Sequence, residues 1–214
     1  MKKYILPSIL FVCFVVFTIL VKFIDVQPIG PQGSLIGFAT INAAVHNFLG
    51  EHHFWYLLTQ LFGVLAICVA AAFACIGFVQ LIKRKSLFKV DRSLIVLGIV
   101  YLAVIILYVL FEKIALNVRP VITEEGLEPS YPSTHTMLIL TIFGTARYAL
   151  KGFCKNEKLF FAAQLLCLVI MILTVAGRLI CGVHWLTDIV GGLLISSALV
   201  SFYSRTNLCN QTSL

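Results

Sequence analysis

A short motif near the C-terminus carries the side chains best suited to chemistry. Between Gly177 and Asp188 the chain reads Gly-Arg-Leu-Ile-Cys-Gly-Val-His-Trp-Leu-Thr-Asp, so that Arg178, His184 and Asp188 lie where two apolar stretches meet. A guanidinium can bind phosphate oxygens in a bidentate manner, and a neutral imidazole can act as a nucleophile. A carboxylate four residues away can fix the tautomer of that imidazole. The motif therefore indicates chemistry on a phosphate ester.

Two further groups of polar side chains lie beside apolar segments: Lys113 with Arg119, and Ser133, Thr134 and His135 after a proline. Lysine and arginine can neutralise phosphate charge. A hydroxyl at the start of a helix, with the backbone amides that follow it, can bind an anion. His135 can act as a general acid toward the leaving group and then as a general base toward water. Together the three groups contain the parts needed to hold and cleave a phosphate ester.

The composition is that of an integral membrane protein. Hydrophobic residues make up 60% of the 214 positions, charged residues make up 12%, and the mean hydropathy is +1.02, which lies outside the range of soluble proteins. Six apolar runs are long enough to cross a hydrocarbon layer about 30 Å thick. We therefore expect an all-α fold, a six-transmembrane-helix bundle forming a single domain over residues 1–214. The predicted spans are Tyr4–Phe23, Phe54–Ile82, Leu94–Phe111, Ser133–Leu150, Leu159–Ile180 and Trp185–Tyr203.

The distribution of positive charge predicts the orientation of these spans. If the N-terminus is cytoplasmic, six spans return the C-terminus to the cytoplasm as well. Of the 16 lysines and arginines, 12 then face the cytoplasm, and the exceptions are Lys22, Lys113, Arg119 and Arg178. All three polar groups then lie at the extracytoplasmic face, where the active site is expected. The net charge of +7 is explained by this topology, and no nucleic-acid partner is expected.

The first extracytoplasmic loop, residues 24–53, contains a further helical pattern. Phe38, Ile41, Val45 and Phe48 recur at intervals of three and four residues, which is typical of one face of a helix. The pattern predicts a short amphipathic helix. This helix lies either in the outer membrane interface or against the rim of the bundle, and the sequence favours neither position.

The three polar groups resemble the signature of the type 2 phosphatidic acid phosphatase superfamily, whose members are integral membrane phosphatases. That signature reads Lys-x6-Arg-Pro, then Pro-Ser-Gly-His, then Ser-Arg-x5-His-x3-Asp. The third group matches it in spacing from Arg178 to Asp188, with Gly177 in place of the serine. The second group has Thr134 in place of the glycine, and the first has one residue fewer between Lys113 and the arginine.

The resemblance implies an enzyme that cleaves lipid phosphates through a phosphohistidine. His184 corresponds to the nucleophile, Asp188 to the group that orients it, and His135 to the general acid and base. The hydroxyl lost at position 177 is expected to weaken phosphate binding by about 1 kcal/mol. No cofactor or metal is expected, because histidine and arginine supply the nucleophile and the charge neutralisation. The residues expected to bind the phosphate are Lys113, Arg119, Ser133, Thr134 and Arg178.

Several substrates and two other functions remain open at this point. Within the family, the substrate could be phosphatidic acid, phosphatidylglycerol phosphate or undecaprenyl pyrophosphate, in each case a lipid phosphate reached from the bilayer of the cell membrane. One alternative is a phosphotransferase, in which an alcohol replaces water. The other is a membrane transporter or an inactive scaffold. The substitutions His184→Ala and His135→Ala would leave the function of such a protein unchanged.

The loop between the first two groups carries three acidic residues, Glu124, Glu125 and Glu128. Two interpretations are open. The carboxylates either belong to a solvated turn or form a gate that discourages highly anionic substrates.

Overall fold

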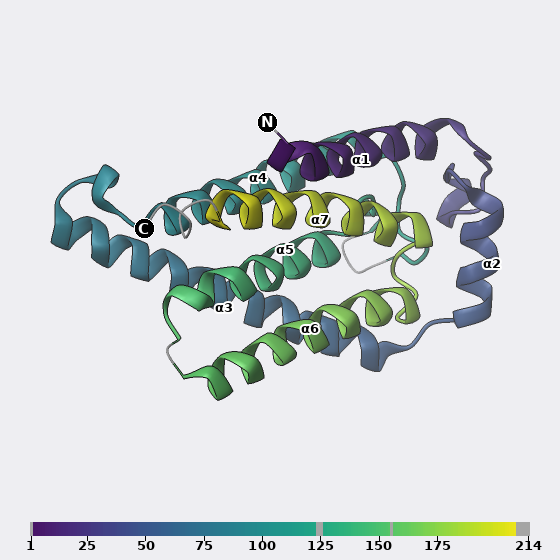
Figure 1. The fold of residues 1–214 in the computed structure, drawn as a ribbon. Coiled ribbons are helices and arrows are strands. Elements are labelled where there is room, and N and C mark those ends of the chain that lie inside the picture. The colour runs from purple at the N-terminus through teal and green to yellow at the C-terminus, as the bar shows by residue number, and fades with distance from the viewer. Residues whose placement is uncertain (1, 123–125, 155, 209–214) are drawn as a thin grey trace.

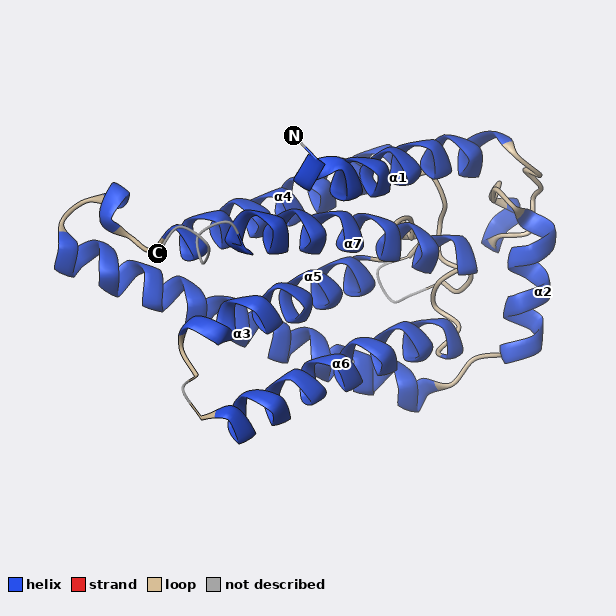
Figure 2. Ribbon diagram, viewed as in Figure 1, coloured by secondary structure: helices blue, strands red, loops and turns tan. Residues whose placement is uncertain are grey.

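Helices account for the regular structure of this chain. The computed structural model describes residues 2–122, 126–154 and 156–208, and no strand occurs in these ranges (Figure 2). The predicted all-α class is confirmed, and each predicted span lies on a helix. The α-helices are α1 (Ile5–Phe23), α2 (Ala39–Leu49), α3 (His53–Arg84), α4 (Arg92–Ile114), α5 (Thr134–Ala149), α6 (Glu157–Ile180) and α7 (Leu186–Leu208).

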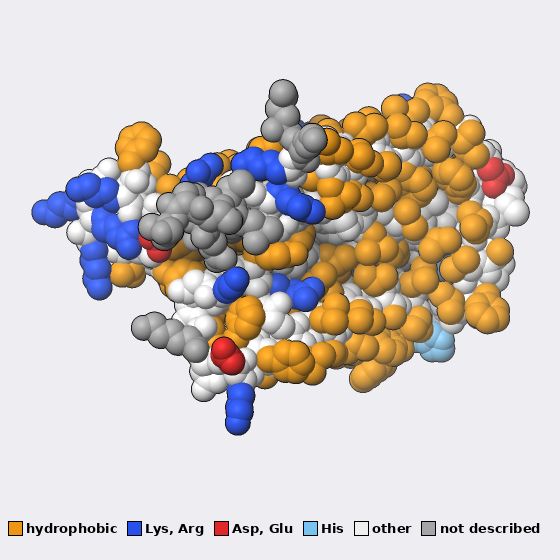
Figure 3. Space-filling model, in the orientation of Figure 1, with side chains coloured by type: hydrophobic (Ala, Val, Ile, Leu, Met, Phe, Trp, Pro, Cys, Tyr) orange, Lys and Arg blue, Asp and Glu red, His pale blue; other side chains and the backbone are white. Residues whose placement is uncertain are grey.

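The sides of the helix bundle are apolar. Five helices, α1, α3, α4, α6 and α7, are long and apolar enough to cross a membrane. Many of their large hydrophobic side chains are exposed, and Figure 3 shows such side chains over most of the bundle's length. An exposed apolar surface of this extent is a membrane-contacting surface rather than one suited to water. The chain is therefore a multi-pass membrane protein.

The helix α5 differs from these five. It has 16 residues, or about 24 Å of length at 1.5 Å per residue, and most of its side chains are buried. It contacts α3, α4, α6 and α7 and occupies the centre of the bundle (Figure 1). The fourth predicted span thus forms a helix enclosed by other helices. The number of membrane crossings stays a prediction.

The helix α2 runs across one end of the bundle, transverse to the other helices (Figure 1). It confirms the short helix predicted in the first loop. Its Asn42 is fully buried, and the helix contacts α6 and α7, whereas Ile41 and Phe48 are exposed. The helix therefore combines the two predicted arrangements, because it packs on the rim through a polar contact and presents its apolar face outward.

Positive charge gathers at the end of the bundle that lies opposite α2. Figure 3 shows most of the lysine and arginine side chains in view at that end. It includes the corner between α3 and α4, where Arg84 and Asp91 form an ion pair at 2.8 Å. This separation is the asymmetry that the positive-inside rule predicts.

Candidate active site

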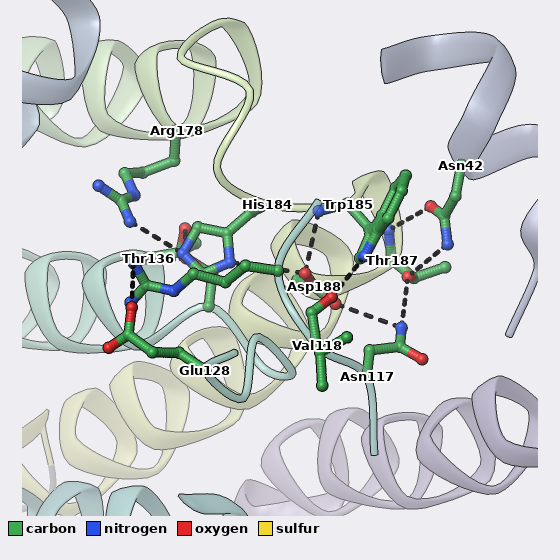
Figure 4. A network of polar contacts seen from close by, with 12 residues as sticks. Asn42, Asn117, Val118, Glu128, Thr136, Arg178, His184, Trp185, Thr187 and Asp188 are labelled. Atoms are coloured by element: carbon green, nitrogen blue, oxygen red, sulfur yellow. Dashed lines mark hydrogen bonds and ion pairs between the residues drawn. The ribbon is translucent and has the colours of Figure 1, made fainter. Parts of the chain in front are cut away.

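Three side chains of the C-terminal motif meet where α6 ends and α7 begins. Arg178 lies in the last turn of α6, His184 in the connecting turn, and Asp188 in the first turn of α7. Arg178 and Asp188 are fully buried, and His184 is 3% exposed. Arg178 Nη2 lies 2.9 Å from His184 Nε2 (Figure 4), and His184 Nδ1 lies 3.5 Å from Asp188 Oδ2. The sequence predicted His184 and Asp188 on one helical face, whereas His184 in fact precedes the helix and the pair spans its N-terminus.

The turn between α6 and α7 requires glycine at position 182. Gly182 has a φ of +75°, a backbone conformation that residues other than glycine adopt only at an energetic cost. A Cβ at this position would also lie 2.9 Å from the carbonyl oxygen of Gly50. The turn is therefore held against the segment that joins α2 to α3, and this fixes the backbone from which His184 projects.

The contacts of His184 assign its tautomer. A guanidinium donates hydrogen bonds and cannot accept them, so His184 Nε2 holds the lone pair that accepts from Arg178. In the neutral imidazole the proton is then on Nδ1, which faces Asp188. This is the arrangement in which a carboxylate orients a histidine whose other ring nitrogen is nucleophilic.

The surroundings of His184 hold its ring neutral. Burial is the main cause of a pKa for His184 that lies well below its ordinary value. The positive charges of Arg178 and Arg119 lower this pKa in the same direction, as does the nearby His135. These three side chains, from three separate parts of the sequence, are thus near enough to act on one imidazole. A neutral ring with a free lone pair is the form required of a nucleophile.

Both oxygens of the Asp188 carboxylate receive hydrogen bonds from the protein. The Trp185 N–H donates to Oδ2 at 2.9 Å, which is a capping contact at the start of α7. Asn117 Nδ2 lies 3.4 Å from Oδ1 and 3.4 Å from Thr187 Oγ1. The Trp185 indole donates to the Val118 carbonyl at 2.7 Å. The carboxylate is therefore fixed both by α7 and by the segment that follows α4.

The helix α2 joins the same network through Asn42 (Figure 4). Asn42 Nδ2 donates to Thr187 Oγ1 at 2.9 Å, and Asn42 Oδ1 accepts from the Thr187 N–H at 3.1 Å. Sequence reasoning missed both Asn42 and Asn117. The available signal was an amide side chain next to apolar segments, since polar groups at membrane depth are costly without partners.

The start of α5 lies against the first turns of α7. Ser133 caps α5 by accepting a hydrogen bond from the Thr136 N–H at 3.4 Å, and its own N–H donates to the Asp188 carbonyl at 3.0 Å. A Cβ at Gly192 would lie 2.9 Å from Thr136 Cβ. Glycine at this position lets the two helices approach closely, and this brings His135 to the end of α7 that carries Asp188.

Among the predicted phosphate-binding residues of α5, Ser133 and Thr134 differ in accessibility. Ser133 is fully buried and uses its hydroxyl as a cap, whereas Thr134 and His135 are half-buried. The capacity of this helix start to bind an anion therefore lies mainly in its backbone amides.

Arg119 forms an ion pair with one of the loop glutamates. Arg119 Nη1 lies 3.3 Å from Glu128 Oε2 (Figure 4), and the Arg119 N–H donates to the Glu128 carbonyl at 3.0 Å. Glu128 is thus partly buried and paired with Arg119, and a role as a gate stays a prediction. Glu124 and Glu125 lie outside the described residues.

Lys113 lies apart from these contacts. It sits in the last turn of α4 with its side chain exposed. Within residues 2–122, 126–154 and 156–208 it forms no hydrogen bond or ion pair. A phosphate contact from Lys113 stays a prediction.

Several buried nitrogens of the site have no hydrogen-bond partner within the described parts of the chain. They are Arg119 Nε, Arg178 Nε, His135 Nδ1 and His184 Nδ1, the last of which faces Asp188 Oδ2 at 3.5 Å. Buried donors of this kind call for a partner, and an anion held between two guanidinium groups would supply one. Over the same ranges, no three histidine, cysteine, aspartate or glutamate side chains are grouped as metal ligands.

Comparison with known proteins agrees with this fold and with the motifs. Residues 109–208, which contain every predicted site residue, match the PAP2 superfamily. The fold is similar to the crystal structure of a transmembrane PAP2 type phosphatidylglycerolphosphate phosphatase from Bacillus subtilis, with a TM-score of 0.65 and 19% sequence identity. That similarity covers 99% of this chain and 98% of the other. No curated protein matches the chain in sequence.

The fold is that of a transmembrane PAP2-type phosphatase, and the part of the chain that carries the three motifs matches the PAP2 superfamily. The match of residues 109–208 to the PAP2 superfamily confirms the resemblance read from the motifs. The chain is accordingly a phosphoric ester hydrolase, and the comparisons support a lipid phosphatase.

Proposed function

We propose that this protein hydrolyses lipid phosphate monoesters or pyrophosphates without a metal ion, through a phosphohistidine formed on His184. One observation carries the proposal. The Nε2 lone pair of His184 faces the Arg178 guanidinium at 2.9 Å, while the Nδ1 side of the ring faces Asp188. A phosphate bound by Arg178 therefore lies next to the nucleophilic nitrogen of an oriented, neutral imidazole.

In the first step, the Nε2 lone pair of His184 attacks phosphorus and the bond from phosphorus to the leaving oxygen breaks. Asp188 stabilises the Nδ1–H as the ring gains positive charge. His135 gives a proton to the leaving oxygen. Arg119 and Arg178 stabilise the charge on the equatorial oxygens, with the Thr134 N–H that follows the Ser133 cap as a further donor and Lys113 as a more distant cation.

In the second step, water attacks the phosphohistidine and the bond between phosphorus and Nε2 breaks. His135, now neutral, takes the proton of the attacking water. The products are inorganic phosphate and the starting form of His184, so atoms and protons balance over the two steps.

The proposal includes a topology of six crossings, with both termini in the cytoplasm and the site at the extracytoplasmic face. The separation of positive charge along the bundle supports this orientation, as does the position of α2 across the end that carries the site (Figure 1). Reporter fusions after residue 208 and within the α2 segment test it, since the proposal requires the two reporters to respond from opposite compartments.

The test of function is phosphate release by the purified protein with a chelator present. The panel contains phosphatidic acid, phosphatidylglycerol phosphate and undecaprenyl pyrophosphate. Phosphatidylglycerol phosphate is the first choice because the Bacillus subtilis protein is named for that activity. His184→Ala should abolish release. The leaving group of a nitrophenyl phosphate needs no general acid, so His135→Ala should still form the phosphoenzyme from this substrate. That acid-labile phosphoenzyme should then be hydrolysed only slowly. Release that requires an added metal ion would overturn the metal-independent mechanism.

A further inference from the structure

The geometry points to Thr59 of α3 as a positioning residue for the Arg178 guanidinium, in place of the serine hydroxyl that this chain lacks at position 177. The inference rests on the proposed function, since it concerns how the same phosphate site is held. It involves a helix that contains none of the three motifs and lies outside the region matched by the superfamily.

Thr59 contacts one terminal nitrogen of the Arg178 guanidinium, and His184 contacts the other. Both residues are fully buried, and Arg178 Nη1 donates to Thr59 Oγ1 at 3.4 Å. The Thr59 hydroxyl donates in turn to the backbone carbonyls of Trp55 and Tyr56, at 2.9 and 3.0 Å. Because the hydroxyl proton is used in that direction, the remaining lone pair of the oxygen is available to accept from the guanidinium.

The Tyr56 ring supports the guanidinium from the same helix. Arg178 Cζ lies 5.7 Å from the centre of this ring, within the range of a cation–π interaction. Arg178 thus contacts both α3 and His184. A long side chain whose guanidinium is held by contacts to both terminal nitrogens presents its remaining N–H groups in one direction. This restriction lowers the entropy that the side chain loses when it binds phosphate.

Gly177 is what allows α3 to come this close to α6. A Cβ at position 177 would lie 2.8 Å from Thr59 Cγ2, which is too close for a real side chain, and 3.0 Å from Trp55 Cε3, which is a very tight contact. A serine at 177 and a threonine at 59 therefore compete for the same space. The departure from the superfamily signature and the α3 contact are two parts of one arrangement.

The same face of α3 also borders His135. A Cβ at Gly63 would lie 3.3 Å from His135 Cδ2 and 3.4 Å from its Nε2. Positions 56, 59 and 63 are three and four residues apart, so they share one helical face. This face, called here the α3 wall, consists of Tyr56, Thr59 and Gly63 and lines the site along both Arg178 and His135.

The first experiment compares Thr59→Val, Thr59→Ser and a matched control, Thr145→Val. Thr145 is a buried threonine of α5 whose hydroxyl also bonds to its own helix, at the Thr141 carbonyl. We expect Thr59→Val to lower kcat/KM by about tenfold, as for one hydrogen bond to a charged group, mainly through KM. Thr59→Ser should restore most of it, and Thr145→Val should match the wild type. A Thr59→Val enzyme with wild-type kcat/KM would overturn the assignment, as would failure of Thr59→Ser to recover.

The second experiment exchanges the hydroxyl between the two helices. Gly177→Ser alone should reduce kcat/KM, because the new side chain meets Thr59 and Trp55. Thr59→Ala/Gly177→Ser removes the clashing methyl group and supplies a hydroxyl from α6, so it should be more active than either single variant. If the reduction of kcat/KM in the double variant instead equals the product of the reductions in the two single variants, the two positions do not substitute for each other. The inference is then wrong.

A readout without turnover separates this inference from the proposed function. Orthovanadate binding to the purified full-length protein, measured by calorimetry, should weaken severalfold in Thr59→Val and recover in Thr59→Ser. If the wild type hydrolyses no lipid phosphate yet vanadate binding follows this pattern, the proposed function fails while the positioning role stands. If the wild type is active and vanadate binds equally to all variants, the positioning role fails alone.

Discussion

The two sides of the His184 ring differ in how completely their polar atoms are hydrogen-bonded. On the Nδ1 side, both oxygens of Asp188 accept from protein donors, and Asn117 and Asn42 are bound in turn to Thr187. On the Nε2 side, Arg178 Nε and Arg119 Nε are buried without partners in the described ranges. On the first side the Asp188 carboxylate is hydrogen-bonded within the protein, and His184 Nδ1 faces it at 3.5 Å without a full hydrogen bond. The second side keeps guanidinium donors that an anion can use.

This difference indicates a division of labour within one small site. Groups that orient the nucleophile must be fixed before substrate arrives, because any freedom they keep is lost again on the way to the transition state. Groups that bind phosphate must remain able to accept a new partner. The proposed roles therefore predict different kinetic effects for the two sides, with kcat affected on the Asp188 side and KM on the arginine side.

The largest effect is expected at the ring between the two sides. His184→Gln keeps a polar side chain but removes the nucleophile, so kcat should fall by about 1,000-fold or more. His52→Gln is the matched control, since His52 is exposed in the segment before α3. Phosphate release by both variants is measured on the best lipid of the panel. Substantial residual turnover in His184→Gln would remove the phosphohistidine from the mechanism.

A smaller effect is expected in the scaffold behind Asp188. Asn117→Leu preserves volume and removes the donor to Asp188, so kcat should drop by roughly tenfold while KM changes little. Asn47→Leu, an exposed position on α2, serves as the control. A rise in KM with kcat unchanged would show that Asn117 acts on binding, and the contrast between the two sides would be lost.

The neutral state of His184 predicts how stability depends on pH. Its pKa in the folded protein is lowered by burial, so below a pH of about 6.5 the unfolded chain takes up a proton that the folded chain does not. Stability from this residue is complete above that pH and is lost as pH falls, by up to about 1.4 kcal/mol per pH unit. Thermal unfolding is measured in detergent over about two pH units, from about pH 7 to about pH 5. The stability of His184→Gln should decline less steeply with falling pH than that of the wild type. Equal slopes would mean that His184 is protonated in the folded protein.

On the arginine side, we expect Glu128 to compete with phosphate for Arg119, with which it forms an ion pair. The pair is only partly buried, with side-chain exposures of 16% and 25%, so its contribution is modest. Glu128→Gln should lower KM by about two- to threefold, and the gain should be larger for a pyrophosphate than for a monoester. Glu112→Gln, an exposed position on α4, is the control. A higher KM in Glu128→Gln would show that the carboxylate instead aligns Arg119.

The smallest effect is expected at Lys113. Because its side chain is exposed and unpaired among the described residues, Lys113→Ala should raise KM by no more than about twofold. Lys22→Ala, an exposed cation at the same end of the bundle, provides the comparison. A tenfold loss confined to Lys113→Ala would place this lysine at the phosphate despite the shortened first motif.

Much of the fold followed from local features of the sequence. Apolar length predicted the helices that form α1, α3, α4, α5, α6 and α7, and a spacing of three and four residues predicted α2. The spacing from Arg178 to Asp188 predicted a cation, an imidazole and a carboxylate in one place, and they are in contact. Their order along the chain could not show that His184 precedes the helix, because helix ends depend on capping contacts such as that of Trp185.

The sequence by itself determined which segments are helical and which side chains can do chemistry, because hydrophobic length and functional groups are local properties. Only the tertiary structure decided which residues support that chemistry. Thr59 contacts Arg178 across 119 positions of sequence, and Asn42 contacts Thr187 across 145. Which residues become partners depends on how closely the helices pack. That packing depends on the absence of a side chain at positions such as Gly177 and Gly192, as much as on any residue that reacts.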